Sequence, residues 1–384
     1  MDELNGLIFN FLTTIPLEVR RVILLIAILI ALVYIYQWLK RFWKLREPIL
    51  LERFAENPIL APIKDHWWES EAVFNPGAFT LDGKVHLFYR ALGRDGISRI
   101  GYAWSTDGIH FERLPYPVFS AQCEVEAKDH YAYTSPIRLS YDTTTYASGG
   151  GWGGCEDPRV VKVGGHIYMT FNMFNGWDAM RVCVTSIQED DLKNQNWDWK
   201  KFVYMASDRQ KNWVFFPDKV KGKYALLHSI HSDNKSKVKI KYLDHLNINE
   251  PLAKFESDDP QKLKSFDIAW HFRTRSAGPP PIKTKYGWLL LYHAMDKAES
   301  HKYKVGAMLL DLKTPTKILA RSNNPILEPD LWYENDWKPG IVYASGAVVL
   351  GEDLIVYYGG GDKYVAMAKV NLEEFLQKLL CQKS

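Results

Sequence analysis

Two adjacent carboxylates followed by a proline and an arginine form the motif in this 384-residue sequence that most resembles catalytic equipment. The motif is Glu156-Asp157-Pro158-Arg159, which follows a glycine-rich loop and precedes the strand-like run 160–171. The proline disfavours a helix at Asp157, and Arg159 shares a face with Asp157 if the segment is a strand. A structural ion pair is the ordinary interpretation of such a pair. Because a glycine-rich loop lets ligands approach the backbone, an acid used in catalysis is the alternative.

Short strands bounded by turn residues must position these side chains. Runs rich in β-branched and aromatic residues recur after residue 55, and they follow turn dipeptides such as Asp82-Gly83, Gly164-Gly165 and Lys221-Gly222. The runs are 84–89, 167–171, 223–227, 288–292 and 354–358. These modules start roughly 55 to 85 residues apart, and amphipathic helix patterns are nearly absent apart from 372–380. We therefore predict an all-β fold, a five-bladed β-propeller, rather than a β-sandwich, whose turns are more closely spaced.

One phrase occurs nearly twice, close to the two ends of the predicted strand region. It reads ENPILAP at 56–62 and NNPILEP at 323–329. Propellers close their ring by pairing the two ends of the chain within one blade, so repetition near both ends suits that architecture. We predict that the two phrases occupy equivalent positions in two blades.

An apolar segment near the N-terminus stands apart from the strands. Residues 22–39 contain no formal charge over about the length of a membrane-spanning helix. No small-residue cleavage site of a signal peptide follows, and a buried helix is disfavoured because the stretch is apolar all round. Basic residues are more frequent after the segment than before it, which places the large domain in the cytoplasm. The predicted parts are a short N-terminal segment 1–21, a single transmembrane helix 22–39, a basic juxtamembrane linker 40–54 and the propeller domain 55–384.

Charge and cysteine content exclude several classes of protein. Lys plus Arg number 48 against 45 for Asp plus Glu, and a net charge of +3 is too small for a nucleic-acid binder that relies on a basic face. The four cysteines lie far apart with no zinc-finger spacing, and the two Gly-Gly-Gly runs lack the strand–helix context of a nucleotide fingerprint. We therefore expect no metal, no cofactor and no nucleic-acid partner.

Several phrases together resemble glycoside hydrolase family 130. They are VFNPGAF, SRIGYAWSTDGIHF, EDPRV, FFPDKVKGKY, AGPPPIKT followed by GWLLLYHAMD, and SGAVV followed by YYGGGD, in order over about residues 55–375. The resemblance implies five-bladed propellers that act on β-mannosides, mainly as inverting phosphorylases and in some cases as hydrolases. The related glycosyltransferase family 108 contains mannosyltransferases and phosphorylases.

The resemblance also implies roles for individual residues. Asp157 matches the general acid, which protonates the leaving oxygen through a hydroxyl of the bound mannose. The predicted substrate-binding residues are Asn75, Arg90, Ser98, Arg99, Arg159, Tyr292 and Asp362. The predicted phosphate-binding residues are Lys211, Arg273, Arg275 and His293.

The phosphate-binding residues are where this sequence departs from the family pattern. Lys211 and Ser229 stand where the phosphorylases have arginines, and Arg273 and Arg275 stand where a lysine is expected. A lysine keeps the charge but cannot form the two parallel hydrogen bonds of a guanidinium group, and serine has no charge. A mannoside phosphorylase with an altered phosphate site is therefore the first hypothesis.

Three other hypotheses remain. One is a membrane-anchored β-1,2-mannosyltransferase that uses GDP-mannose or mannose 1-phosphate. Another is a β-mannoside hydrolase, for which no second carboxylate is singled out by its spacing. A third is a mannan-binding propeller without turnover. The partners expected from these hypotheses are a β-mannooligosaccharide, inorganic phosphate or a sugar phosphate, and the membrane, with a homo-oligomer left open.

Aromatic residues and one long loop are candidates for outer sugar contacts. Trp67, Trp68 and Trp152 could stack on sugar rings, although packing is the more common role for a tandem pair at the start of a blade. The segment 124–152 reads as an irregular loop that leads into the Glu156–Asp157 strand. We hypothesise that it covers the site and sets the length of the acceptor.

Overall fold

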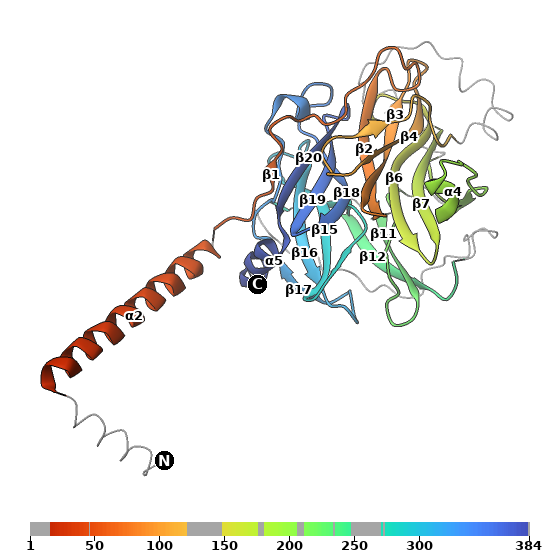
Figure 1. The fold of residues 1–384 in the computed structure, drawn as a ribbon. Helices are drawn as coiled ribbons and strands as arrows, with labels where there is room; N and C mark the ends of the chain where they lie inside the picture. The colour runs from red at the N-terminus through yellow and green to blue at the C-terminus, as the bar shows by residue number, and fades with distance from the viewer. Residues whose placement is uncertain are drawn as a thin grey trace. The chain divides into compact units, whose positions relative to one another are not determined.

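A computed structural model describes residues 16–45, 47–120, 148–175, 180–205, 211–232, 235–246, 270–271 and 273–382. The chain divides into two compact units, Met1–Glu47 and Pro48–Ser384 (Figure 1). Most of the predicted loop 124–152, up to residue 147, lies outside the described residues.

The described part of the smaller unit is one helix, α2, over Leu17–Lys44. Its stretch Leu17–Lys40 has a mean hydropathy of 2.6 and is long and apolar enough to cross a membrane. That criterion uses length and composition alone, and an N-terminal signal sequence also meets it. The helix extends beyond the predicted 22–39 at both ends because Lys, Arg and Glu are good helix formers.

The larger unit is mostly β. Its strands are β1 (Glu52–Arg53), β2 (Ala72–Leu81), β3 (Lys84–Leu92), β4 (Ile97–Ser105), β5 (Glu112–Arg113), β6 (Gly153–Val163), β7 (His166–Asn175), β8 (Arg181–Gln188), β9 (Val203–Tyr204), β10 (Val214–Phe215), β11 (Tyr224–Ser232), β12 (Lys235–Leu243), β13 (Arg273–Ala277), β14 (Ile282–Thr284), β15 (Gly287–Met295), β16 (Lys304–Leu310), β17 (Ile318–Arg321), β18 (Val342–Leu350), β19 (Asp353–Gly360) and β20 (Tyr364–Asn371). The helical elements are α4 (Glu189–Lys193), the 3-10 turn η2 (Trp332–Glu334) and α5 (Leu372–Cys381), which forms where the amphipathic pattern predicts it.

Consecutive strands form antiparallel meanders joined by tight turns. The meanders are β2–β5, β6–β9, β10–β12, β13–β17 and β18–β20, and a short parallel pairing of β4 with β6 joins the first two into one sheet. Asp82 and Gly83 both have positive φ, as do Lys221 and Gly222, which is the backbone of the two-residue hairpins that the sequence predicts.

Hydrophobic clusters lie between successive meanders. Phe88 of the first packs with Phe171 of the second. Other clusters join the second meander to the third, the third to the fourth and the fourth to the fifth. The fifth meander packs back on the first, where Tyr357 and Tyr89 share a cluster. The five meanders therefore pack in a closed cycle.

The start of the larger unit is built into its last meander. Strand β1 pairs antiparallel with β20, as the two labels in Figure 1 show side by side, while Ile49 and Leu51 are buried in a cluster with strands of the fourth and fifth meanders. The predicted linker 40–54 is therefore too long, because two of its apolar residues belong to the core. The helix accounts for its first part, up to Lys44.

The repeated phrase occupies equivalent positions, as predicted. Leu60 pairs with Val365 at the start of β20, and Leu327 pairs with Val305 at the start of β16. Each phrase thus lies against the third strand of a meander.

Candidate active site

β-Bulges in β2 and β6, the first strands of two meanders, bring two polar residues into contact. The register shifts at Phe74/Gly77 in β2 and at Glu156/Arg159 in β6, so that Asn75 and Asp157 are extra residues. Both have left-handed backbones, with φ of 49° and 52°. Asn and Asp tolerate this conformation better than most residues, and such strain is often found at functional sites.

Asn75 and Asp157 meet because β2 and β6 lie next to each other. The Asn75 amide nitrogen donates to Oδ1 of Asp157 at 2.7 Å. Gly359 on β19 makes the close approach of Asn75 possible, because a Cβ at that position would lie 2.0 Å from Asn75 Oδ1. This glycine of the phrase YYGGGD therefore leaves room for the side chain of Asn75.

Arg90 on β3 connects both carboxylates of the motif. Its Nη2 lies 2.9 Å from Glu156 Oε1, and its Nη1 lies 3.5 Å from Asp157 Oδ1. Its Nε donates to Ser98 Oγ at 2.9 Å, as the pairing of β3 with β4 allows. Ser148 completes the cluster by donating to Glu156 Oε2 at 2.8 Å.

The pKa values of the two carboxyl groups, Glu156 and Asp157, are shifted in opposite directions. Burial raises the pKa of Glu156 to about 7, although Arg90 acts in the other direction. Burial also acts to raise the pKa of Asp157, but Arg90, Arg159 and the amide of Asn75 outweigh it and hold the pKa below its usual range. Asp157 is therefore ionised in the free protein, while Glu156 holds a proton over much of the range below pH 7.

Arg159 does not form the direct ion pair with Asp157 that strand alternation predicts. The bulge changes the direction of the chain, and the guanidinium group donates to the carbonyls of Asp157 at 3.2 Å and Gly278 at 2.9 Å. It also lies over the ring of Tyr343, 5.3 Å from the centroid. Its Nη2 is buried and meets no hydrogen-bond partner among the described residues.

His293 on β15 contacts the same tyrosine, Tyr343, as Arg159 does. Its ring stacks on Tyr343 at 4.1 Å, and Ser276 Oγ lies 3.0 Å from its Nδ1. Burial lowers the pKa of His293 to about 3, and the charge of Arg159 adds to this effect. His293 is therefore neutral at physiological pH and serves as a hydrogen-bonding group.

Lys211 brings a positive charge to the cluster. It lies close enough that its charge lowers the pKa of both Glu156 and Asp157. Its neighbour Asn212 has a φ of 60° and is fixed by a reciprocal pair of hydrogen bonds with Asn172, at 3.0 and 2.9 Å. Asn172 pairs with Glu156 across β6 and β7, so these bonds tie the Lys211 segment to the motif.

Two predicted substrate-binding residues lie away from this cluster. Arg99 points to the opposite face of β4 from Ser98, where it pairs with Asp95 at 2.7 Å and stacks on Trp67. Tyr292 alternates with His293 and points into a hydrophobic cluster, with its hydroxyl accepting from Arg321 at 3.0 Å. The structure does not bring either side chain into the cluster, because adjacent residues of a strand face opposite sides.

The structure relates the other predicted site residues less directly to the cluster. Asp362 is buried, has a φ of 54° and pairs with Lys338 at 3.1 Å. Arg273 and Arg275 lie on β13, next to a bulge, but their side chains are outside the described residues, as is that of Ser229 on β11.

Several residues of the cluster were missed from the sequence. They are Ser148, Asn172, Asn212, Ser276 and Tyr343. Tyr343 stands two residues before the phrase SGAVV and Ser276 stands directly before AGPPPIKT, so both could have been found there, whereas Ser148 and the two asparagines belong to none of the matching phrases. In the described ranges no group of three or more His, Cys, Asp or Glu residues is placed to hold a metal ion.

A carboxyl group held at a defined place in a buried site is a group that can transfer a proton when a glycosidic bond is cleaved or formed. The model of glycoside hydrolase family 130, described as beta-1,4-mannooligosaccharide phosphorylase, matches residues 143–380. This chain therefore belongs to glycoside hydrolase family 130.

Relatives of known activity extend over most of the chain. A 1,2-beta-oligomannan phosphorylase of Thermoanaerobacter sp. (strain X514) is 35% identical over 85% of this chain and 99% of its own length. A beta-1,2-mannobiose phosphorylase of the same strain is 34% identical over 84% of this chain and 98% of its own length. The solved structure of the Listeria innocua beta-1,2-mannobiose phosphorylase with beta-1,2-mannobiose has a TM-score of 0.62 at 21% identity, covering 86% of this chain and 99% of that one. The last likeness concerns the fold.

Proposed function

We propose that this chain is an inverting phosphorylase of β-1,2-linked mannooligosaccharides that releases mannose 1-phosphate, with Asp157 as the general acid. Two relatives at 34–35% identity act on these substrates by name and match nearly end to end. The observation in the molecule that carries the proposal is the buried cluster of Asn75, Arg90 and Asp157, which holds one carboxylate in a defined position.

The reaction needs one proton-transferring group. Phosphate attacks the anomeric carbon, the glycosidic carbon–oxygen bond breaks, and the leaving oxygen takes the proton of Asp157, through a mannose hydroxyl if the family relay applies. In synthesis Asp157 takes the proton back. Its low pKa in the free protein suits the synthetic direction. A phosphate anion beside Lys211 and Arg159 would offset their positive charge, raise the proton affinity of Asp157 and so prepare the acid for phosphorolysis.

Phosphate is a better attacking group for this site than water. Water needs a carboxylate base on the face opposite the leaving group. Glu156 does not suit that role, because both its oxygens already accept hydrogen bonds and its residue is 1% exposed. Lys211, Arg159 and His293 instead offer donors to an anion, with Arg273 and Arg275 on the adjacent strand β13. These five residues are the proposed phosphate site, with a lysine in place of the family's arginine.

We propose further that the larger unit is a five-bladed β-propeller. The closed cycle of five meanders supports this architecture, as does the pairing of β1 with β20, which joins the two ends of the unit in one blade. The first strands β2, β6, β10, β13 and β18 then surround the centre, where the bulges place the site.

Helix α2 is proposed as a membrane anchor, with the catalytic unit in the cytoplasm. The residues after the apolar stretch include Lys40, Arg41 and Lys44, whereas Arg20 and Arg21 precede its most apolar part. This distribution of charge supports the orientation. Inorganic phosphate and sugar phosphates are cytoplasmic metabolites, so the orientation also suits the proposed chemistry.

The test is an assay of the detergent-extracted full chain with β-1,2-mannobiose and inorganic phosphate. Phosphate-dependent release of mannose 1-phosphate is the expected result. A parallel reaction contains GDP-mannose and mannose. Product in that reaction alone would replace the proposal with a mannosyltransferase, phosphate-independent release of mannose would indicate a hydrolase, and binding of mannan without any turnover would indicate a binding module.

A further inference from the structure

A tryptophan outside all of the predicted site residues lies next to the candidate active site. Trp337 belongs to the loop between η2 and β18, and a Cβ at Gly150 would lie 3.3 Å from its indole ring. A Cβ at the preceding Gly149 would lie 3.3 Å from Nη1 of Arg90, which contacts Asp157. Trp337 is therefore separated from the catalytic cluster by one thin segment of glycines.

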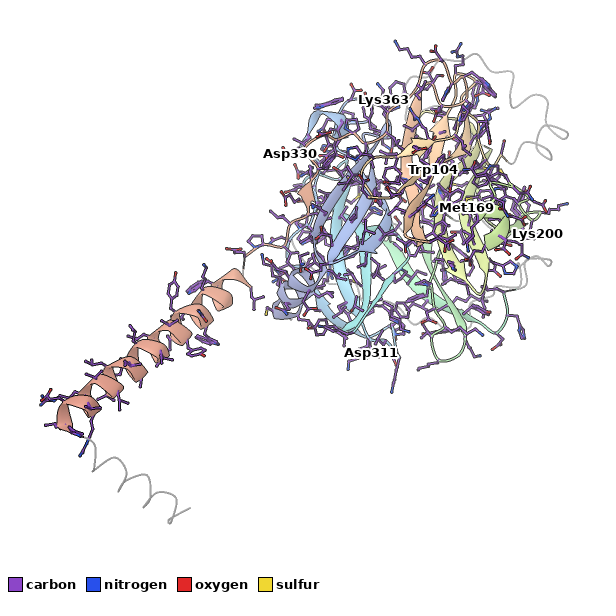
Figure 2. The ribbon with its side chains drawn as sticks, in the orientation of Figure 1. Trp104, Met169, Lys200, Asp311, Asp330 and Lys363 are labelled. Carbon is purple, nitrogen blue, oxygen red and sulfur yellow. The ribbon has the colours of Figure 1, made fainter. Side chains whose placement is uncertain are left out.

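The loop that holds Trp337 lies at the end of the strands that carries Lys363. Lys363, labelled in Figure 2, lies at one end of the strands and Asp311 lies at the other. The Nζ of Lys363 lies over the Trp337 ring, 5.8 Å from its centroid. Trp337 is thus at the end that carries Lys363 and the neighbouring Asp362, which is one of the predicted substrate-binding residues.

The chemistry of this place suits a sugar ring. Trp337 is half-buried as a residue, and aromatic faces pack against the apolar faces of sugars. Its indole N–H is buried and meets no acceptor among the described residues. The adjacent Lys338 and Asp362 form an ion pair at 3.1 Å, which offers both a donor and an acceptor to hydroxyl groups.

The two sides of the site differ in charge and origin. Of the proposed phosphate-binding groups, Lys211 lies in the segment that leads into the third meander and His293 lies in the fourth, and Arg159 donates to the carbonyl of Gly278, which follows β13 of the fourth. Trp337, Lys338 and Asp362 come from the fifth meander and the loop that enters it. Inverting transfer requires the attacking and leaving groups on opposite faces of the sugar. The leaving sugar therefore belongs on the side of Trp337.

We propose that Trp337, with the Lys338–Asp362 ion pair, forms the subsite for the mannosyl residue on the leaving-group side of the cleaved bond. The inference rests on the proposed function, because it assigns a part of the substrate to one side of the same site. In the synthetic direction this subsite binds the acceptor mannose, while mannose 1-phosphate occupies the cluster around Asp157.

Kinetics of the synthetic reaction measure binding at the two subsites separately, because each substrate occupies one of them. With mannose 1-phosphate and mannose as substrates, Trp337→Ala should raise the KM for mannose at least fivefold and leave the KM for mannose 1-phosphate within twofold. Trp337→Phe keeps a ring but removes the N–H, and its KM for mannose should fall between those of the wild type and the alanine variant. The matched control is Trp332→Ala in the same region of the chain, where the side chain is 61% exposed and packs on Tyr364; this variant should leave both constants unchanged. Equal increases in the two constants for Trp337→Ala, or no increase, would overturn the proposal.

A binding measurement tests the subsite without depending on turnover. Titration calorimetry with β-1,2-mannobiose should show at least fivefold weaker binding to Trp337→Ala than to the wild type, with Trp332→Ala unchanged. If the wild-type chain binds mannobiose through Trp337 but releases no mannose 1-phosphate, the proposed function fails and the subsite stands. If it phosphorolyses mannobiose and Trp337→Ala binds normally, the subsite fails alone. A wild-type chain that does not bind mannobiose overturns both.

Discussion

At the scale of single residues, the central feature is that neighbours in the chain have different proton affinities. Glu156 and Asp157 are consecutive, yet the bulge directs Asp157 to Asn75 while both share Arg90. Burial dominates for Glu156, and positive charge with an amide donor dominates for Asp157. The site thus holds one ionised carboxylate, to which the proposed function assigns proton transfer, and one carboxyl group that limits the negative charge in the cluster.

Replacement of Asp157 by Asn tests the catalytic assignment. The amide cannot transfer the proton, so kcat for phosphorolysis should fall by about 10²–10⁴-fold. Binding of mannobiose should change little, because Asn can still accept from Asn75, and the variant should fold with a lowered melting temperature, because Arg90 and Arg159 lose a buried counter-charge. The control is Asp353→Asn, whose carboxylate forms a partly exposed ion pair with Lys369. Retention of most of the activity by Asp157→Asn would show that another group is the acid.

Replacement of Glu156 by Gln tests the raised pKa. The folded-state pKa of about 7 lies above the ordinary value of 4.5, so the folded protein keeps a proton that the unfolded chain releases. The stability due to this proton is complete below pH 4.5 and is lost as the pH rises through 7. Gln cannot titrate, so the wild type should lose on the order of 2 kcal/mol more than Glu156→Gln between pH 5 and pH 8.

Urea unfolding at the two pH values measures that difference. Glu299→Gln is the matched control, since Lys302 and Lys304 lower the pKa of Glu299 to about 2, outside the window. Its pH dependence should parallel that of the wild type. Parallel curves for Glu156→Gln as well would contradict the raised pKa.

At the scale of elements, the residues of the candidate site lie largely at bulges in the first strands of the meanders. A second feature is the pairing of β1 with β20, which joins the two ends of the larger unit. Bulges occur in β2, β6, β13 and β18, so polar residues interrupt strands that are otherwise buried. Strand β1 is only two residues long, but Arg53 forms two bonds to the fully buried carboxylate of Glu334, at 2.8 and 3.0 Å. That ion pair attaches the start of the unit to the loop before β18.

Removal of the Arg53 side chain should therefore destabilise the larger unit. Arg53→Ala leaves Glu334 buried without its cation, and we expect a loss of about 2–4 kcal/mol in the free energy of unfolding. Chemical denaturation of the wild type and the variant measures it. Lys285→Ala is the comparison, because its pair with Glu373 is exposed to solvent and should contribute little to the free energy of unfolding. Equal effects of the two substitutions would argue against a role for β1 in closure.

At the scale of the whole molecule, a catalytic unit follows a helix suited to a membrane. The boundary at Glu47/Pro48 leaves Ile49 and Leu51 in the catalytic unit, where they are 2% and 4% exposed. A soluble catalytic fragment should therefore start at residue 48. A start at 55, where the sequence pattern places the domain, would remove β1 and two core side chains.

Two fragments and the full chain test both boundaries. The fragment 48–384 should melt at least roughly 5 °C above the fragment 55–384, since burial of each large apolar side chain contributes about 1.5–3 kcal/mol. The full chain should sediment with membranes and need detergent for extraction, whereas 48–384 should stay in the supernatant. Equal melting temperatures would contradict the role of residues 48–54, and a full chain that is soluble without detergent would contradict the anchor.

Motifs located the catalytic cluster but did not show which neighbours point into it. Asp157, Asn75 and Arg90 were predicted from their phrases and do meet. Arg99 and Tyr292 were predicted from equally suggestive phrases and point away, because a phrase names a strand while alternation and bulges decide which face each residue takes. The interaction of Asn172 with Asn212 joins segments 40 residues apart, and no local pattern indicates it.

The amino-acid sequence alone determined the mostly-β class, the hairpin turns, the apolar helix and the motif that contains Asp157, because these depend on local periodicity and on residue types at short spacing. The tertiary structure decided which carboxyl group is ionised, which arginine contacts it and that Trp337 lies beside Gly150. Those features depend on distances between segments brought together by the packing of five meanders, and on burial, which exists only once the chain is folded.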